Sequence, residues 1–168
     1  DIPDGPVHKE NKLFNRICFG YDKENLYFRF YINQFVKDIS EAKRRVHQLY
    51  VYTRNKNKNH SLSPIRVIHK AESIIPIAKE KFHNEIQISI NEEEVNLVRL
   101  AEAIPGNLWI IKSSKDLAAF FKKSIDVKVP FDSLGIGHGE TVEFFFINAN
   151  FGVKDFYLPN DMLLNITR

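Results

Sequence analysis

The stretch that decides the fold runs from Leu26 to Asn33 and reads LYFRFYIN. Its apolar positions alternate with tyrosine and polar ones: Leu26, Phe28, Phe30 and Ile32 against Tyr27, Arg29, Tyr31 and Asn33. A period of two is typical of a strand that buries one face. The preceding stretch 13–21, LFNRICFGY, predicts a second strand, and the turn residues 22–25 join the two. The pair therefore predicts a β-hairpin.

Further strands follow outward from this hairpin, separated by turn signals at short intervals. We predict them at 46–53, 65–69, 82–90, 95–103, 125–129 and 141–150, with a last one that begins at 156. Helix is scarce: a stripe over 34–45 is ambiguous, 116–123 predicts a short helix, and 132–135 reads as a helical turn closed by a glycine. About nine short strands predict an all-β fold, an antiparallel β-sandwich of immunoglobulin-like or jelly-roll-like type with one or two short helices.

The composition agrees with one globular domain spanning 1–168. The chain has 168 residues, 14 Phe, 6 Tyr and 1 Trp, and a net charge of +3 that is too small to argue for nucleic acid by itself. Cys18 is the single cysteine, so no internal disulfide can form. No apolar stretch is long enough to predict a membrane span. The start at Asp1, without an initiator methionine, leads us to expect a fragment of a larger protein.

Several strings carry a family resemblance when they are taken in order. They are GPVHK at 5–9, RICFGYDKENLYFRFYI at 16–32, SIDVKVPFDSLGI at 124–136, HGETVEFFFINA at 138–149 and DFYLP at 155–159. Together they resemble the C-terminal domain of glycoside hydrolase family 57 proteins. That domain is similar to the glucodextranase C-terminal domain and to family 9 carbohydrate-binding modules, which are grouped as DOMON-like.

The resemblance implies a β-sandwich attached to an amylase-like or glucanotransferase-like catalytic domain of the same chain. The chain would then be no enzyme by itself, and it would hold no catalytic residues and no cofactor. Its partners would be that catalytic domain and a polysaccharide or oligosaccharide such as an α-glucan. The alternative is a purely structural domain that packs on the catalytic domain without a sugar site.

Aromatic side chains are the candidates for sugar binding, because a pyranose face packs on a ring. Trp109 follows the turn at 105–106 and is the first candidate. Tyr50 and Tyr52 share one strand face, which is either a binding strip or the solvent face of the strand. Tyr157 is a further candidate, and the resemblance adds His8 because it falls on the family's Gly-x-x-His segment. Family 9 modules hold the sugar between two tryptophans, whereas this chain has one.

Three other kinds of site are less favoured by the sequence. A structural calcium ion would be held by Asp4 and Asp22 by analogy with related modules, although a turn aspartate commonly binds its own backbone. Glycoside hydrolysis needs two opposed carboxylates, and no pair has a distinguishing context. The cations around Tyr50 and Tyr52 suit single-stranded nucleic acid, but no corresponding fold signature is present.

Overall fold

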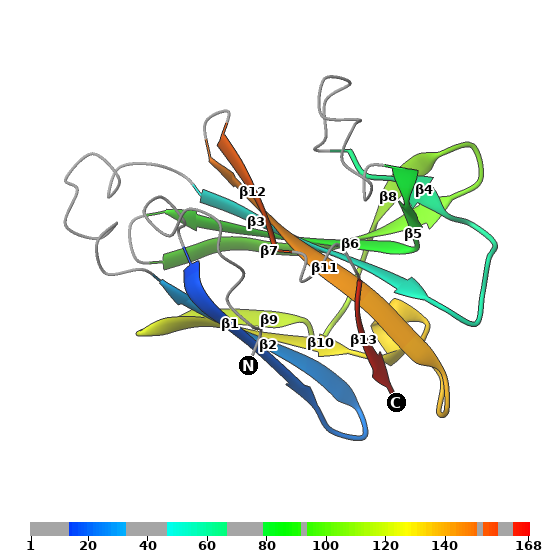
Figure 1. Cartoon of the computed structure of the whole chain (residues 1–168), viewed down its shortest axis with the longest axis horizontal. Coiled ribbons are helices and arrows are strands. Elements are labelled where there is room, and N and C mark those ends of the chain that lie inside the picture. The colour runs from blue at the N-terminus through cyan, green and yellow to red at the C-terminus, as the bar shows by residue number, and fades with distance from the viewer. Residues whose placement is uncertain (1–13, 33–46, 67–78, 92–93, 151–152, 158–162) are drawn as a thin grey trace.

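The computed structural model describes residues 14–32, 47–66, 79–91, 94–150, 153–157 and 163–168. These residues form antiparallel sheets that pack in two layers (Figure 1). The predicted all-β sandwich is therefore confirmed. The ambiguous stripe at 34–45 lies outside the described residues.

The smaller layer is a four-stranded antiparallel sheet with the order β1-β2-β10-β9. Its strands are β1 (Phe14–Tyr21), β2 (Asn25–Ile32), β9 (Ala118–Phe121) and β10 (Ser124–Pro130). The predicted hairpin is confirmed, since Tyr21 pairs with Leu26 and β1 runs along the whole of β2. Asp22 closes the turn, because its Oδ1 accepts the backbone N–H groups of Glu24 and Asn25.

The larger layer is a seven-stranded sheet with the order β12-β11-β3-β6-β7-β8, and β13 also pairs with β11. Its strands are β3 (His47–Asn55), β6 (Asn84–Asn91), β7 (Glu94–Ile104), β8 (Leu108–Lys112), β11 (Thr141–Asn150), β12 (Val153–Tyr157) and β13 (Leu164–Thr167). A separate two-stranded ribbon joins β4 (Ser63–Pro64) to β5 (Lys81–Phe82). Both large sheets are antiparallel throughout their described pairs, as expected for a sandwich.

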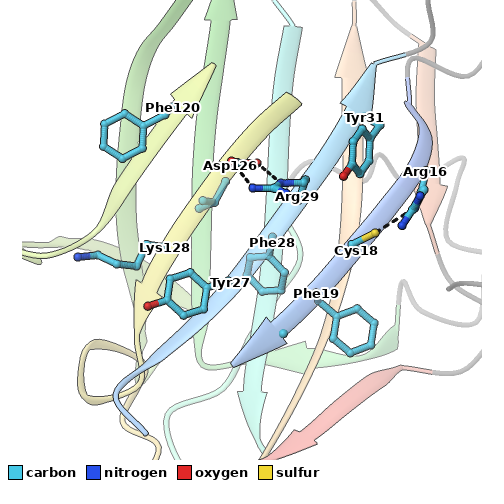
Figure 2. A pocket seen from close by; sticks show the side chains of 12 residues that line it. Arg16, Cys18, Phe19, Tyr27, Phe28, Arg29, Tyr31, Phe120, Asp126 and Lys128 are labelled. Carbon is cyan, nitrogen blue, oxygen red and sulfur yellow. Dashed lines mark hydrogen bonds and ion pairs between the residues drawn. The ribbon is translucent and has the colours of Figure 1, made fainter. Parts of the chain in front are cut away.

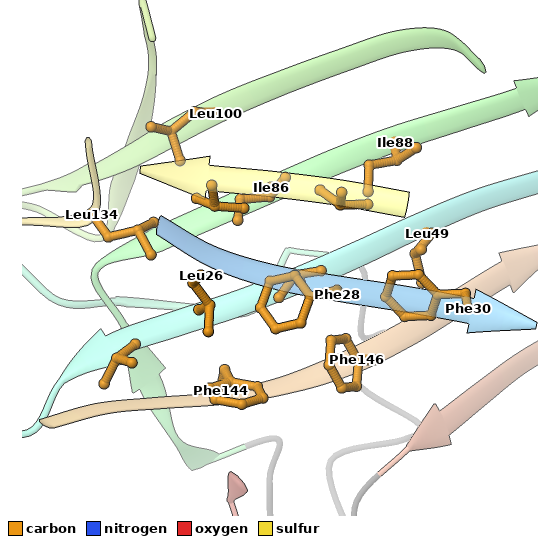
Figure 3. Packing of buried hydrophobic residues seen from close by; sticks show 14 of the residues in the cluster. Leu26, Phe28, Phe30, Leu49, Ile86, Ile88, Leu100, Leu134, Phe144 and Phe146 are labelled. Atoms are coloured by element: carbon orange, nitrogen blue, oxygen red, sulfur yellow. The ribbon is translucent and has the colours of Figure 1, made fainter. Parts of the chain in front are cut away.

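The main core lies between the two sheets and combines aliphatic side chains with phenylalanine rings (Figure 3). Phe28 of β2 meets Phe144 and Phe146 of β11 edge to face, with ring centroids 5.4 and 5.2 Å apart. Phe30 contacts Phe146 in the same way at 5.2 Å. Edge-to-face contacts favour one relative position of the rings beyond the gain from burial. The alternation of β2 thus fixes which face of the small sheet is buried and leaves Tyr27 and Arg29 on the other.

A second apolar cluster lies on the opposite face of the large sheet. It consists of Tyr50, Tyr52, Ile65, Phe82, Phe145 and Ile147, with Trp109 packed against it. Phe82 of β5 and Ile65, which directly follows β4, belong to this cluster. The large sheet is therefore covered on both faces in this region.

Two local expectations have different outcomes. The helix predicted at 116–123 is wrong: Ala118–Phe121 is strand β9, which pairs with β10 from Phe121 opposite Ile125 to Ala118 opposite Lys128. Sheet pairing overrides the weak helical preference of this segment. The helical turn closed by a glycine is confirmed as the 3₁₀ helix η4 (Asp132–Leu134), where Gly135 has φ 68°.

Candidate functional site

An open groove of about 590 Å³ lies on the outer face of the four-stranded sheet (Figure 2). This volume falls in the range of small-molecule sites. The lining comes from β1, β2, β9 and β10: Arg16, Cys18, Phe19, Gly20, Tyr27, Phe28, Arg29, Tyr31, Phe120, Asp126, Val127 and Lys128. Every strand of the sheet contributes to it.

Strand register arranges the outward side chains in rows across the sheet. In the middle row Cys18 pairs with Arg29, Arg29 with Asp126, and Asp126 with Phe120. Directly opposite residues of antiparallel strands lie on one face about 5 Å apart. The middle row therefore sets a thiol, an ion pair and an aromatic ring side by side.

The flanking rows follow the same rule. One contains Gly20, Tyr27, Lys128 and Ala118, and the other contains Arg16, Tyr31 and Ser124. A Cβ added at Gly20 would meet no heavy atom within 4 Å, so this position opens directly into free space. Small side chains on β1 and β9 thus leave room above the sheet.

Arg29 and Asp126 form a bidentate ion pair in the middle of the groove. Arg29 Nε donates to Asp126 Oδ1 at 2.7 Å and Nη2 donates to Oδ2 at 2.8 Å. Ser124 Oγ also donates to Oδ1 at 3.0 Å. The hydrogen bonds from Arg29 lower the pKa of Asp126, so the carboxylate is charged at neutral pH. Both side chains are about half exposed, which leaves lone pairs and N–H groups for a ligand.

Aromatic rings stand at the borders of the groove. Phe120 is 64% exposed, a high value for a large apolar side chain. Tyr27 is 38% exposed, and its hydroxyl donates to Asp22 Oδ2 at 2.7 Å. The guanidinium of Arg16 lies 5.1 Å from the centroid of the Tyr31 ring. The groove therefore combines apolar ring surface with charged groups.

Tyr50 and Tyr52 do not form the exposed strip that the alternation suggested. They are 7% and 0% exposed, and the Tyr52 ring stacks on Phe145 with centroids 5.6 Å apart. The Tyr52 hydroxyl donates to Glu85, and burial together with this carboxylate raises the tyrosine's pKa. Because the second apolar cluster covers this face of the large sheet, neither ring offers a platform to solvent.

Trp109 is half-buried beside that cluster. Its ring meets Tyr52 edge to face at 6.0 Å, and its Nε1 donates to the carbonyl of Pro64 at 3.1 Å. The guanidinium of Arg66 lies 5.6 Å from the ring centroid. These contacts hold the indole against the β4–β5 ribbon, away from the groove.

Of the remaining predicted site residues, the structure describes Tyr157 and Asp22. Tyr157 ends β12, where its backbone pairs with Phe146 of β11. His8 and Asp4 lie outside the described residues. Asp22 binds two backbone N–H groups and the Tyr27 hydroxyl, and these hydrogen bonds lower its pKa. Across the described ranges, no group of three or more His, Cys, Asp or Glu could hold a metal ion.

The sequence prediction did not single out the groove's central residues, Arg29, Asp126 and Phe120. One signal was available, since the alternation of β2 sets Tyr27, Arg29 and Tyr31 on one face. The missing information was that β10 pairs with β2, which brings Asp126 opposite Arg29 although 97 residues separate them. Local patterning specifies the face of a strand and not its neighbour.

Comparison with known proteins adds no relative. No protein-family model matches the chain, and searches of curated proteins and of solved structures return no significant match. The resemblance to the family 57 C-terminal domain therefore stays a prediction. Within the part of the chain that the structure describes, no helix has the length and apolarity needed to cross a bilayer.

Proposed function

We propose that this chain is a non-catalytic carbohydrate-binding domain whose ligand lies in the groove of the four-stranded sheet. One observation carries the proposal: the half-exposed Arg29–Asp126 pair lies beside the exposed ring of Phe120. A sugar has hydroxyl groups at its edges and C–H groups on its faces. The carboxylate and guanidinium match the hydroxyls, and the ring matches a C–H face.

Binding rather than hydrolysis is supported by the acids in the groove. Glycoside hydrolysis uses one carboxyl group as an acid and a second one on the other side of the bond. Among the described residues that line the groove, Asp126 is the single carboxylate. Its pKa is lowered by the hydrogen bonds from Arg29, so Asp126 is deprotonated at neutral pH and has no proton to donate to a leaving group.

The family resemblance supplies the context of this proposal. In that context the domain lies beside an amylase-like or glucanotransferase-like catalytic domain of the same chain and binds the same glycan, such as an α-glucan. A structural role is the second candidate function. It is favoured by the exposed apolar side chains of Leu108 and Ile110, which lie on one face of β8, since exposed apolar surface of this kind is typical of contact with another domain.

Titration of the protein with glycans, followed by NMR and calorimetry, tests the proposal. Suitable ligands are malto-oligosaccharides, β-glucan oligosaccharides and xylan oligosaccharides. We expect Phe120→Ala to weaken binding about tenfold, in the range of a well-packed aromatic contact. Ile111→Ala is the matched control, because Ile111 is equally exposed, at 60%, but lies on β8 of the other sheet. Its affinity should equal that of the unmodified protein.

A groove-filling variant gives a second, independent test. Gly20→Leu places a side chain in free space above the sheet and needs no positive φ, so the fold should be retained. The added side chain should abolish glycan binding while the melting temperature stays close to that of the unmodified protein. Absence of binding by every glycan would reject the proposal and leave the structural role.

A further inference from the structure

We propose that two copies of this chain pair antiparallel along β8 and form a symmetric dimer. This surface is separate from the groove, so the inference does not depend on glycan binding. β8 forms one edge of the large sheet, and within the described residues it pairs with β7 alone. An open sheet edge presents unpaired backbone groups that can receive another strand.

The pairing of β7 shows which way its backbone groups point. The N–H of Ala103 donates to the carbonyl of His83, which directly precedes β6, at 2.8 Å. The backbone groups of Ala103 therefore lie on the side of β6. Because these groups alternate between the two sides of an antiparallel strand, those of Glu102 and Ile104 point to β8.

On β8 the open edge belongs to the backbone groups of Trp109 and Ile111. Leu108 and Ile110 lie directly opposite the two β7 residues whose groups point to β8, so they form the hydrogen-bonded pairs of this hairpin. Alternation then directs the N–H and C=O groups of Trp109 and Ile111 away from β7. Both residues are available to pair with a further strand.

One antiparallel register between two copies pairs both of these residues with residues of β8. When Trp109 of one copy lies opposite Ile111 of the other, the two exchange a pair of hydrogen bonds, and the two-fold symmetry repeats this pair. Ile110 then lies on the two-fold axis opposite its own copy. A shift by two residues would place either Trp109 or Ile111 opposite a residue outside β8.

The side chains match in the same register. Ile111 is 60% exposed and would cover the half-buried indole of Trp109, since alternation sets both on the face of the second apolar cluster. Ile110 is 47% exposed and would meet its own copy on the other face. Lys112, the single charged residue of β8, would lie opposite Leu108. The register therefore opposes no like charges along the two strands.

A second copy also has room on the inner face of the large sheet. Leu100 of β7 belongs to the main core, whereas Leu108 and Ile110 lie on the same face and are exposed. The small sheet therefore leaves this part of β8 uncovered. The two-fold axis of an antiparallel strand pair is perpendicular to the sheet, so both small sheets would lie on one side of the joined sheet, with the paired β8 strands between them.

The dimer should be weak because the contact is small. It consists of one strand from each copy, with the backbone groups of two residues and the apolar side chains beside them. Such a contact buries less surface than a standard protein–protein interface, so we expect a dissociation constant of about 10–100 µM. Sedimentation equilibrium over a range of about 5–500 µM protein measures it.

A charge placed on the axis tests the position of the contact. Ile110→Lys sets two lysines opposite each other and should weaken the dimer at least about a hundredfold, because opposed like charges repel. Phe120→Lys is the matched control, since it makes the same change at an exposed apolar residue on β9 of the other sheet. Its dissociation constant should equal that of the unmodified protein. Thermal melting checks that both variants are folded.

Cysteine cross-linking tests the register. In a Cys18→Ser background, which removes the native thiol, Ile110→Cys should form a disulfide-linked dimer on mild oxidation. The two Cα atoms at this position would lie about 4.5 Å apart, within the reach of a disulfide. Ile111→Cys is the control, because its two Cα atoms would lie about 9 Å apart in this register and should not be linked. Non-reducing electrophoresis measures both.

Each outcome decides the inference without reference to any glycan. A dimer that Ile110→Lys disrupts and Ile110→Cys traps would support it. A monomer at every concentration would overturn it and leave β8 as a contact with another domain. An unchanged dissociation constant in Ile110→Lys, or loss of the dimer in Phe120→Lys, would place the contact elsewhere and overturn it. Equal cross-linking of Ile110→Cys and Ile111→Cys would likewise reject the register on which it rests.

Discussion

The hydroxyl of Tyr52 donates to Oε2 of Glu85 at 2.5 Å, across the paired strands β3 and β6. Both side chains are buried, and the guanidinium of Arg66 donates to both oxygens of the same carboxylate. Three donated hydrogen bonds thus satisfy the Glu85 carboxyl oxygens beside the second apolar cluster. This network makes Tyr52 part of the structural support of the large sheet.

Tyr52→Phe should destabilise the protein without affecting glycan binding. The substitution deprives a buried carboxylate of a hydrogen bond, and such a loss costs about 1–3 kcal/mol. Urea unfolding measures the change in the free energy of unfolding. Tyr27→Phe is the matched control, because the exposed Tyr27 hydroxyl binds the exposed Asp22. An equal loss of unfolding free energy in Tyr27→Phe and Tyr52→Phe would show that burial of the Tyr52 hydrogen bond is not what stabilises the protein.

Truncation of two phenylalanines should change the free energy of unfolding by very different amounts. Phe144→Ala empties a fully buried site between the sheets and should cost about 3–5 kcal/mol of unfolding free energy. Phe120→Ala removes a largely exposed ring and should change stability by no more than about 0.5 kcal/mol. Chemical denaturation of both variants is the measurement. A large loss in Phe120→Ala would show that the ring stabilises the fold and would weaken its role as a binding surface.

Stability should fall as the pH is lowered through the titration range of His83. Its Nδ1 accepts the backbone N–H of Asn55 at 3.0 Å, and burial lowers its pKa below the usual value of 6.5. The unfolded chain then binds a proton at a pH where the folded protein does not. The stabilising contribution is complete above pH 6.5 and is lost as the pH falls from there toward the folded-state pKa.

Thermal melting at about pH 7.5 and about pH 5.5 tests this dependence. His83→Gln supplies a side-chain oxygen that can accept a hydrogen bond and does not titrate. Its melting temperature should vary less between the two pH values than that of the unmodified protein. Equal pH dependence of the two proteins would exclude His83 as the source.

Gly135→Ala should destabilise the loop that follows β10. Gly135 has φ 68°, a left-handed conformation that costs a residue with a Cβ about 1 kcal/mol. Gly20→Ala is the control, because Gly20 has no positive φ and no neighbouring atom within 4 Å of an added Cβ. Urea unfolding of the two variants should show a loss for Gly135→Ala alone.

The sequence was sufficient for the fold class because strand alternation is a local property. The pattern of β2 predicted its hairpin with β1 and its buried face, since every second residue must lie on the same side of a sheet. The glycine-closed turn at 132–135 was predictable for a similar reason, because its signal lies in adjacent residues. The pairing of β2 with β10 was not predictable, and the groove depends on it.

The misplaced candidates share a different cause. Alternation assigned Tyr50 and Tyr52 to one face of β3, but it did not reveal that other residues cover that face. Trp109 was chosen for its position after a turn, and its indole N–H instead binds the carbonyl of Pro64, 45 residues earlier. The helix at 116–123 failed because the pairing partner of 118–121 decides its conformation. Each error comes from a contact between distant segments.

The position of β2 between β1 and β10 also sets the order in which the molecule can assemble. During synthesis the β1–β2 hairpin leaves the ribosome before β10, so the other edge of β2 stays unpaired until residues 124–130 have also emerged. Pairing between segments this far apart in the sequence is typical of slow folding. The unpaired edge of β2 is meanwhile a template for association with another chain. Nascent or refolding chains should therefore pass through an aggregation-prone interval that ends when β10 docks on β2.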